Sequence, residues 1–135
     1  MKRIPLNYET LRSRLSYIED SLKSLQRFKG KTFKEFSSNP DNFRIAFYDL
    51  HRALEAVIDI GSHILSRLPG ARATSYKEIP LLLGKNKIIP SEFSKKEFLQ
   101  MAGYRKRMVH FYSEISEKEL YKIISENLKD LKKFC

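Results

Sequence analysis

The feature that most constrains the fold is a long run of regularly spaced apolar residues between Asp41 and Leu68. These residues recur at alternating steps of three and four, which places them on one side of an α-helix. They are Phe47, Leu50, Leu54, Val57, Gly61, Ile64 and Leu68, with Ile58 and Leu65 widening the stripe. Pro40 and Asp41 are typical of a helix start. We therefore predict one long helix over 41–68, in which Gly61 permits close approach of a neighbouring helix.

Other segments have the same helical periodicity, and short polar or glycine-containing links separate them. The predicted helices are Asn7 to Phe28, a helical turn capped at Thr32-Phe33-Lys34-Glu35, Tyr76 to Leu83 ended by Gly84, Glu92 to Phe111 capped by Ser91, and a last helix with a capping box formed by Ser116 and Glu119. No strand pattern and no internal repeat is present. The sequence predicts a single all-α domain over residues 1–135, an antiparallel four-helix bundle with an extra short helix.

The charge balance favours an acidic partner. The chain has 26 Lys and Arg against 16 Asp and Glu, a net charge of +10, and such an excess is typical of proteins that contact polyanions. The single cysteine, Cys135, excludes an intrachain disulfide and lacks the companions of a metal site. No signal peptide or membrane-spanning run is recognisable, so we expect a cytoplasmic protein. We also expect that the protein uses neither a metal nor a cofactor.

The segment Gly103 to Tyr112 contains the candidate functional residues. Arg105 interrupts an apolar helical stripe, and a buried arginine requires an acidic partner or a polar cleft. The stripe consists of Phe98, Ala102, Arg105, Val109 and Tyr112. On the long predicted helix, Glu55, Asp59 and His63 recur at steps of four and share one ridge. Two interpretations stay open: the ridge is a solvated face with local pairs such as Asp59 with His63, or Glu55 or Asp59 reaches Arg105.

His110 and Arg105 are sufficient for metal-free cleavage of RNA. An imidazole can take a proton from a 2′-hydroxyl at neutral pH, and a guanidinium can stabilise the charge that builds on phosphorus. Five residues along a helix correspond to about 140° of rotation, so the two side chains point in different directions. Either the helix deforms near Met108, or a second copy of the chain completes the site. Lys106 and Arg107 are predicted to be solvated, and His51 carries no signal.

The stretch Arg105-Lys106-Arg107-Met108-Val109-His110-Phe111-Tyr112 resembles the Arg-x4-His-x-Tyr motif of HEPN domains, in the HepT-like branch. The second-helix pattern from Glu55 to Ile64, the approach from Leu99 to Tyr104, and the segment Leu120 to Ile124 also resemble that branch. The resemblance covers most of the chain from about Phe43 onward. Lys106 departs from the pattern, because the family usually has Asn or another small polar residue directly after the arginine.

The resemblance implies an all-α HEPN-like bundle and a homodimer with the motifs at the subunit interface. It also implies a metal-independent endoribonuclease toxin of a type VII-like toxin–antitoxin pair. Its antitoxin would be a minimal nucleotidyltransferase that attaches AMP to Tyr112. Arg105 and His110 would then be catalytic, with Glu55, Asp59 and Lys106 as residues that support them.

Two other functions stay open. The chain can be a non-catalytic helical partner subunit of a nucleotidyltransferase, which the departure at Lys106 favours. It can also be a basic nucleic-acid-binding bundle, whose affinity would fall steeply with salt and would not depend on His110.

Overall fold

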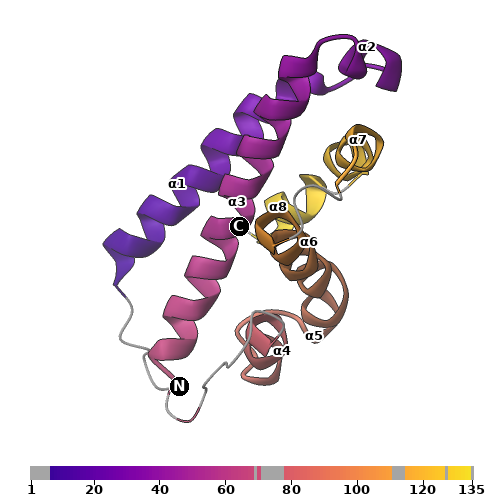
Figure 1. Ribbon diagram of the computed structural model, residues 1–135. Coiled ribbons are helices and arrows are strands. Elements are labelled where there is room, and N and C mark those ends of the chain that lie inside the picture. Colours follow the sequence, from indigo (N-terminus) through magenta and orange to yellow (C-terminus); the bar gives the residue numbers. More distant parts are fainter. Residues whose placement is uncertain (1–6, 69, 71–77, 111–114, 127, 135) are drawn as a thin grey trace.

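The computed structural model describes residues 7–68, 70, 78–110, 115–126 and 128–134, with the side chain of residue 110 left aside. Within these ranges the secondary structure is entirely helical, as predicted (Figure 1). The elements are α1 (Tyr8–Leu25), η1 (Gln26–Phe28), α2 (Phe33–Ser37), α3 (Pro40–Ser66), α4 (Glu78–Lys85), α5 (Ser91–Phe93), η2 (Ser94–Phe98), α6 (Leu99–His110), α7 (Glu117–Glu126) and α8 (Leu128–Phe134). No helix among the described residues has both the length and the hydropathy needed to cross a membrane.

The two longest helices, α1 and α3, lie side by side and antiparallel along the molecule (Figure 1). Apolar side chains from both are buried in one continuous core, among them Ile18, Leu25, Leu54 and Val57. The link between the helices contains α2, which has the predicted capping box. The Thr32 hydroxyl accepts from the Glu35 amide, and the Thr32 amide donates to the Glu35 carboxylate. Asn39 then caps α3 directly before Pro40, so the predicted start of the long helix is confirmed.

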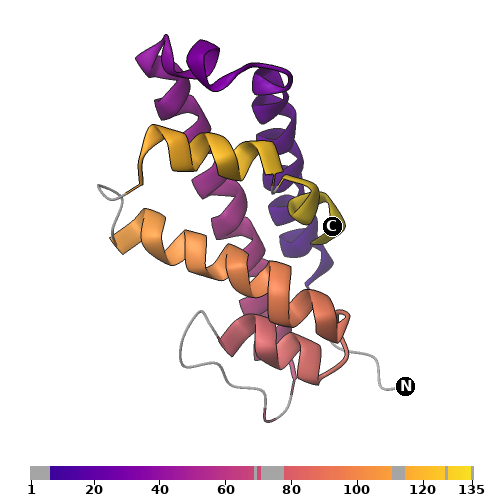
Figure 2. The same cartoon turned by 90° about the vertical axis from the view of Figure 1, so that its right-hand side faces the viewer.

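The opposite side of α3 is covered by α4, α6 and α7. In Figure 2, α6 and α7 cross this side in opposite directions. A methyl group at Gly61 of α3 would lie 2.6 Å from Ile79 Cγ2 of α4 and 3.2 Å from Leu83 Cδ1. The prediction that Gly61 permits close approach of a neighbouring helix is therefore confirmed.

Gly84 has a different role from the predicted one. It does not end the short helix, because α4 continues to Lys85. A methyl group at Gly84 would lie 2.6 Å from Cβ of Ser94, whose hydroxyl donates to the Pro80 carbonyl at 2.6 Å inside the fold. Pro80 sits in the first turn of α4, where a missing amide costs no helical hydrogen bond. Gly84 thus allows α4 and η2 to pack closely, and the predicted start at Tyr76 lies outside the described residues.

The predicted helix from Glu92 to Phe111 is interrupted. A short α5 is followed by one π-helical turn, η2, before regular winding resumes in α6. Ser91 is the first helical residue and Pro90 occupies the cap position, so the prediction of Ser91 as N-cap is wrong. The predicted last helix is described as α7 and α8, and its Ser116 hydroxyl accepts from the Glu119 amide at 3.1 Å, as expected.

Candidate functional site

The motif arginine is buried on α6. Of the predicted stripe, Phe98 and Ala102 are buried and Val109 is partly buried, while Tyr112 lies outside the described residues; Arg105 itself is only 8% exposed. A guanidinium that deep in an apolar helix face needs a charged partner, because an isolated buried charge is very costly.

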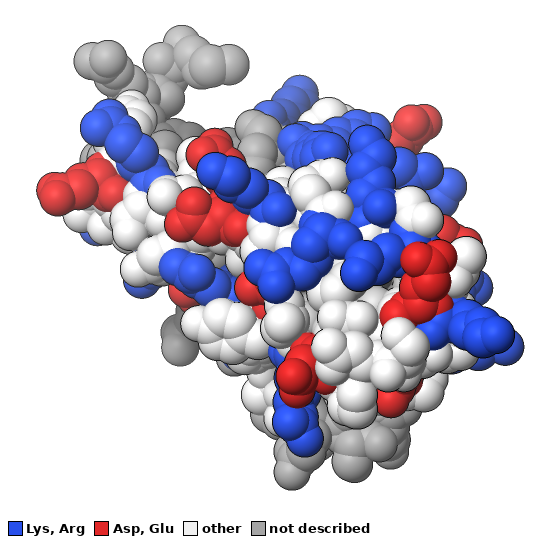
Figure 3. Space-filling model, turned by 90° about the horizontal axis from the view of Figure 1, so that it is seen from above, with Lys and Arg blue, Asp and Glu red and all other residues white. Residues whose placement is uncertain are grey.

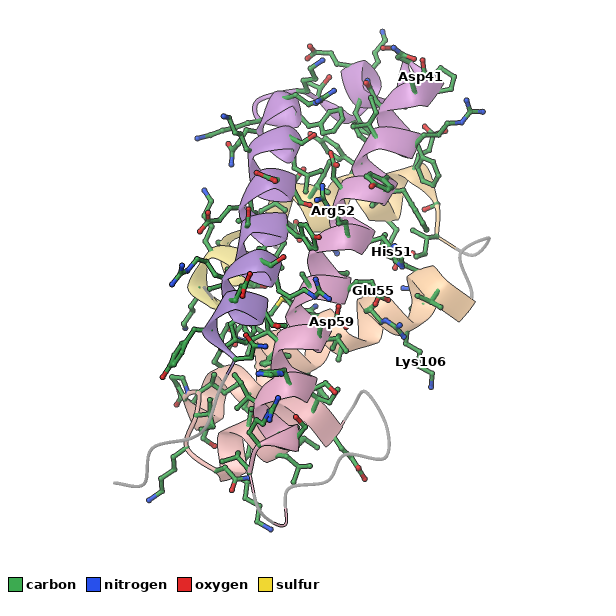
Figure 4. All side chains as sticks on the ribbon, turned by 90° about the vertical axis from the view of Figure 1, so that its left-hand side faces the viewer. Asp41, His51, Arg52, Glu55, Asp59 and Lys106 are labelled. Atoms are coloured by element: carbon green, nitrogen blue, oxygen red, sulfur yellow. The ribbon has the colours of Figure 1, made fainter. Side chains whose placement is uncertain are left out.

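Glu55 of α3 is that partner. Arg105 Nε donates to Glu55 Oε1 at 2.6 Å, a charge-assisted hydrogen bond between residues that are 50 apart in the sequence. The side chains are 10% and 31% exposed, so the pair lies in a partly desolvated position between α3 and α6. Figure 4 shows Glu55 on α3, directed towards α6. The interpretation in which the α3 ridge reaches Arg105 is therefore confirmed for Glu55.

Asp59, one turn further along α3, faces a different helix. Its carboxylate pairs with Arg14 Nε of α1 at 3.3 Å, where the two side chains are 50% and 35% exposed. Partial burial raises the pKa of Asp59, the Arg14 charge opposes this shift, and the nearby Glu55 carboxylate adds to it. The neighbouring His63 accepts a hydrogen bond at Nε2 from the Asn7 amide at 3.1 Å. Asp59 and His63 thus have separate partners, so the predicted pair between them is wrong.

A histidine that the sequence analysis did not single out, His51, belongs to the same row on α3. His51 Nε2 lies 3.7 Å from Glu55 Oε1, the oxygen that binds Arg105. His51, Glu55 and Asp59 follow one another along α3 in Figure 4. The signal that could have found His51 is its four-residue spacing from Glu55, which extends the ridge by one turn towards the start of the helix.

The two basic residues after Arg105 differ from each other. Lys106 is exposed, and Figure 4 shows its side chain pointing away from the row on α3. Arg107 forms a two-pronged ion pair with Glu119 of α7, in which NH2 donates to Oε2 at 2.9 Å and NH1 contacts Oε1. The prediction that Arg107 is solvated is wrong, because it ties α6 to α7.

The path from Arg105 to His110 is regular α-helix, and Met108 between them is buried. Of the two alternatives, a helix that deforms near Met108 is therefore wrong, and positions 105 and 110 lie about 140° apart around the axis. The His110 side chain and the whole of Tyr112 lie outside the described residues, so their roles stay predictions. Within the described ranges, no three His, Cys, Asp or Glu side chains group closely enough to hold a metal ion.

The arrangement that the structure shows is an oriented guanidinium. Its anchoring at Nε by Glu55 and its burial against the core fix the plane of the group before any ligand arrives. A guanidinium held in one orientation is well suited to bind a phosphate oxygen or to stabilise charge that develops on one.

The family model described as "Ribonuclease HepT-like" matches residues 18–135. A protein named tRNA nuclease HepT, from Aphanizomenon flos-aquae (strain 2012/KM1/D3), is 30% identical over 115 residues, covering 85% of this chain and 78% of its own.

Solved structures show the same fold. A toxin–antitoxin structure with AMP-PNP superposes with a TM-score of 0.81 at 23% identity, covering 93% of this chain and 94% of the other. A tri-AMPylated HEPN toxin from Shewanella oneidensis in complex with MNT antitoxin gives 0.80 at 24% identity, with 93% and 92% covered. YutE, a cytosolic protein of unknown function from Bacillus subtilis, gives 0.81 at 20% identity, with 98% and 87% covered. At such identities these likenesses concern the fold alone. On the family match and the curated relative, this chain belongs to the ribonuclease HepT-like family.

Proposed function

We propose that this protein is a metal-independent endoribonuclease toxin of a type VII-like toxin–antitoxin pair, acting on RNA in the cytoplasm. The observation that carries the proposal is the buried Arg105, oriented by Glu55 on the helix that ends at His110. Family membership and the similarity to a protein named as a tRNA nuclease support the same activity.

The chemistry follows from the two side-chain types. His110 takes the proton of a ribose 2′-hydroxyl, whose oxygen attacks the adjacent phosphorus. Arg105 stabilises the negative charge on the phosphoryl oxygens as the bond to the 5′-oxygen breaks. The leaving 5′-oxygen takes a proton from a water molecule, and the hydroxide that remains takes the proton held by His110, which gives a 2′,3′-cyclic phosphate and a 5′-hydroxyl. Each atom is accounted for without a metal ion.

A homodimer reconciles this chemistry with the helix geometry. Positions 105 and 110 lie on different sides of a regular α6, so one helix does not direct both groups at one phosphate. A symmetric dimer that brings two α6 helices together places an arginine of one subunit opposite a histidine of the other.

Tyr112 is the proposed point of control. A minimal nucleotidyltransferase antitoxin transfers AMP from ATP to the Tyr112 hydroxyl and releases pyrophosphate. The attached phosphate, seven residues from Arg105 in the sequence, competes with the RNA phosphate for the guanidinium. The tri-AMPylated toxin bound to MNT antitoxin, a relative in fold, supports this form of regulation.

The decisive experiment compares His110→Ala with His63→Ala. The purified variants are incubated with RNA in EDTA, and cleavage is followed on a gel. We expect the wild type and His63→Ala to cut RNA and His110→Ala to lose at least about 100-fold in rate, the usual contribution of a general base. Equal cleavage by the two variants would remove the catalytic role of His110.

A second function, that of a non-catalytic partner subunit of a nucleotidyltransferase, is favoured by the exposed Lys106 on the motif helix. It predicts no cleavage by the wild type. If the wild type does not cleave RNA, Lys106→Asn tests whether the lysine is the cause. This change restores the family's usual residue, so cleavage should return only if Lys106 blocks it.

A further inference from the structure

A basic hollow of about 430 Å³ lies where the link between η1 and α2 meets α7 and α8. Its lining includes three lysines, Lys29, Lys31 and Lys132, and no carboxylate. The Tyr121 hydroxyl of α7 donates to the Lys31 carbonyl, which fixes the link against α7. Three lysines at one hollow give it a positive potential that favours an anion.

A second hollow, of about 520 Å³, adjoins the first along α7. Tyr121 and Ser125 line both hollows, so the two hollows are direct neighbours along α7. The second hollow adds Lys118, Lys122 and the ring of Phe33, which is 39% exposed and packs edge-on against Tyr121 at 5.6 Å. Its carboxylates are those of Glu119 and Glu126.

The surface continues to the motif helix. Glu119 in the second hollow is the residue that pairs with Arg107 of α6, two positions after Arg105. Its charge is thereby offset, so the five lysines of the two hollows outnumber the one other carboxylate there, that of Glu126. Figure 3 looks down on the end of the molecule that holds α2 and α7, where lysine and arginine side chains gather over much of the face.

We propose that these adjoining hollows, here named the α7 track, bind a single-stranded segment of RNA that flanks the cleaved bond. Lysines spaced along a groove neutralise successive phosphates, and an exposed aromatic ring offers a face on which a base stacks; together these are the features of single-strand binding surfaces. The inference rests on RNA being the substrate, as proposed above. An acidic protein partner would use the lysines but has no need of the Phe33 ring.

The test measures RNA binding by the full-length His110→Ala protein, which should not degrade its ligand. Affinity for a fluorescent, unstructured RNA is measured by anisotropy at several salt concentrations. Lys31→Gln with Lys122→Gln is compared with Lys85→Gln with Lys95→Gln, two exposed lysines on α4 and η2 at the other end of the molecule. We expect the slope of log K against log salt to fall by about 1.4 for the track pair, about 0.7 per lost phosphate contact, and to stay unchanged for the control pair.

A second comparison tests the aromatic face. Phe33→Leu should weaken binding about 5-fold or more, because one base loses its stacking partner. Tyr8→Leu, which removes an aromatic residue that is 60% exposed at the start of α1, should not weaken it. Thermal unfolding of each variant confirms that the fold is retained.

Equal slope changes in the two lysine pairs would overturn the track, since binding would then follow diffuse charge. Loss of nucleotidyltransferase binding with unchanged RNA affinity would overturn it as well and would assign the surface to a protein partner. Failure of the proposed function is a different result: the wild type would cut no RNA while the lysine-dependent binding persists.

Discussion

The two sides of α3 each hold an ion pair, and the two pairs differ in length and in exposure to water. Towards α6, Glu55 meets Arg105 at 2.6 Å with the arginine side chain only 10% exposed. Towards α1, one turn later, Asp59 meets Arg14 at 3.3 Å with half of the acid side chain exposed. The first pair sits where water is largely excluded, and the second sits where water competes. Equal charges one turn apart are therefore expected to contribute unequally to stability.

The largest expected effect breaks the inner pair. Glu55→Ala leaves the buried Arg105 without its carboxylate, and we expect the free energy of unfolding to fall by about 3 kcal/mol. Asp59→Ala should cost less than about 1 kcal/mol, as exposed pairs do. Urea unfolding of both variants measures the difference. Similar losses would show that the two sides of α3 are energetically alike.

An intermediate effect concerns the distance between α3 and α4. Gly61→Ala places a methyl group 2.6 Å from Ile79 Cγ2, and we expect a loss of about 1 to 2 kcal/mol because overpacking outweighs the gain in helix propensity. Gly103→Ala is the matched control: nothing lies within 4 Å of its added methyl group. That variant should gain up to about 1 kcal/mol. A stabilising Gly61→Ala would show that α4 can move away from α3.

The smallest expected effect sharpens the comparison on the outer side. The pKa of Asp59 lies above its ordinary value of 3.8, chiefly because of burial. Its ionisation is therefore less favourable in the folded state than in the unfolded chain, and this penalty appears as the pH rises from below 3.8 through the raised pKa. We therefore compare the free energy of unfolding of Asp59→Asn with that of the wild type. The difference in favour of Asp59→Asn should be larger at neutral pH than at about pH 3. Urea unfolding at both pH values measures it, and the opposite trend would mean that the Arg14 contact dominates.

The helices of α1 and α3, the capping box at Thr32 and the close approach at Gly61 could all be predicted, because each depends on local spacing or on one residue type. The partner of Arg105 could be narrowed only to Glu55 or Asp59. Periodicity places both acids on one ridge, but it does not state which neighbouring helix each turn of the ridge faces. Arg14 and His51 were missed for the same reason, since their importance arises from packing between helices.

The residues that follow Arg105 show another limit of prediction from sequence. The sequence predicts a solvated Arg107, because its partner Glu119 lies on another helix, α7, whose position the sequence does not reveal. The roles of His110 and Tyr112 stay predictions, because the His110 side chain and the whole of Tyr112 lie outside the described residues.

The single π-helical turn at η2 also decides the direction in which Arg105 faces. Such a turn accommodates one residue more than α-helical winding does, so every position after it is rotated by about 100° relative to an uninterrupted helix. Residues 94–98 thus determine which side of α6 faces α3. With one residue fewer there, the guanidinium would swing about a quarter of a turn away from Glu55, although every residue of the motif would still be present.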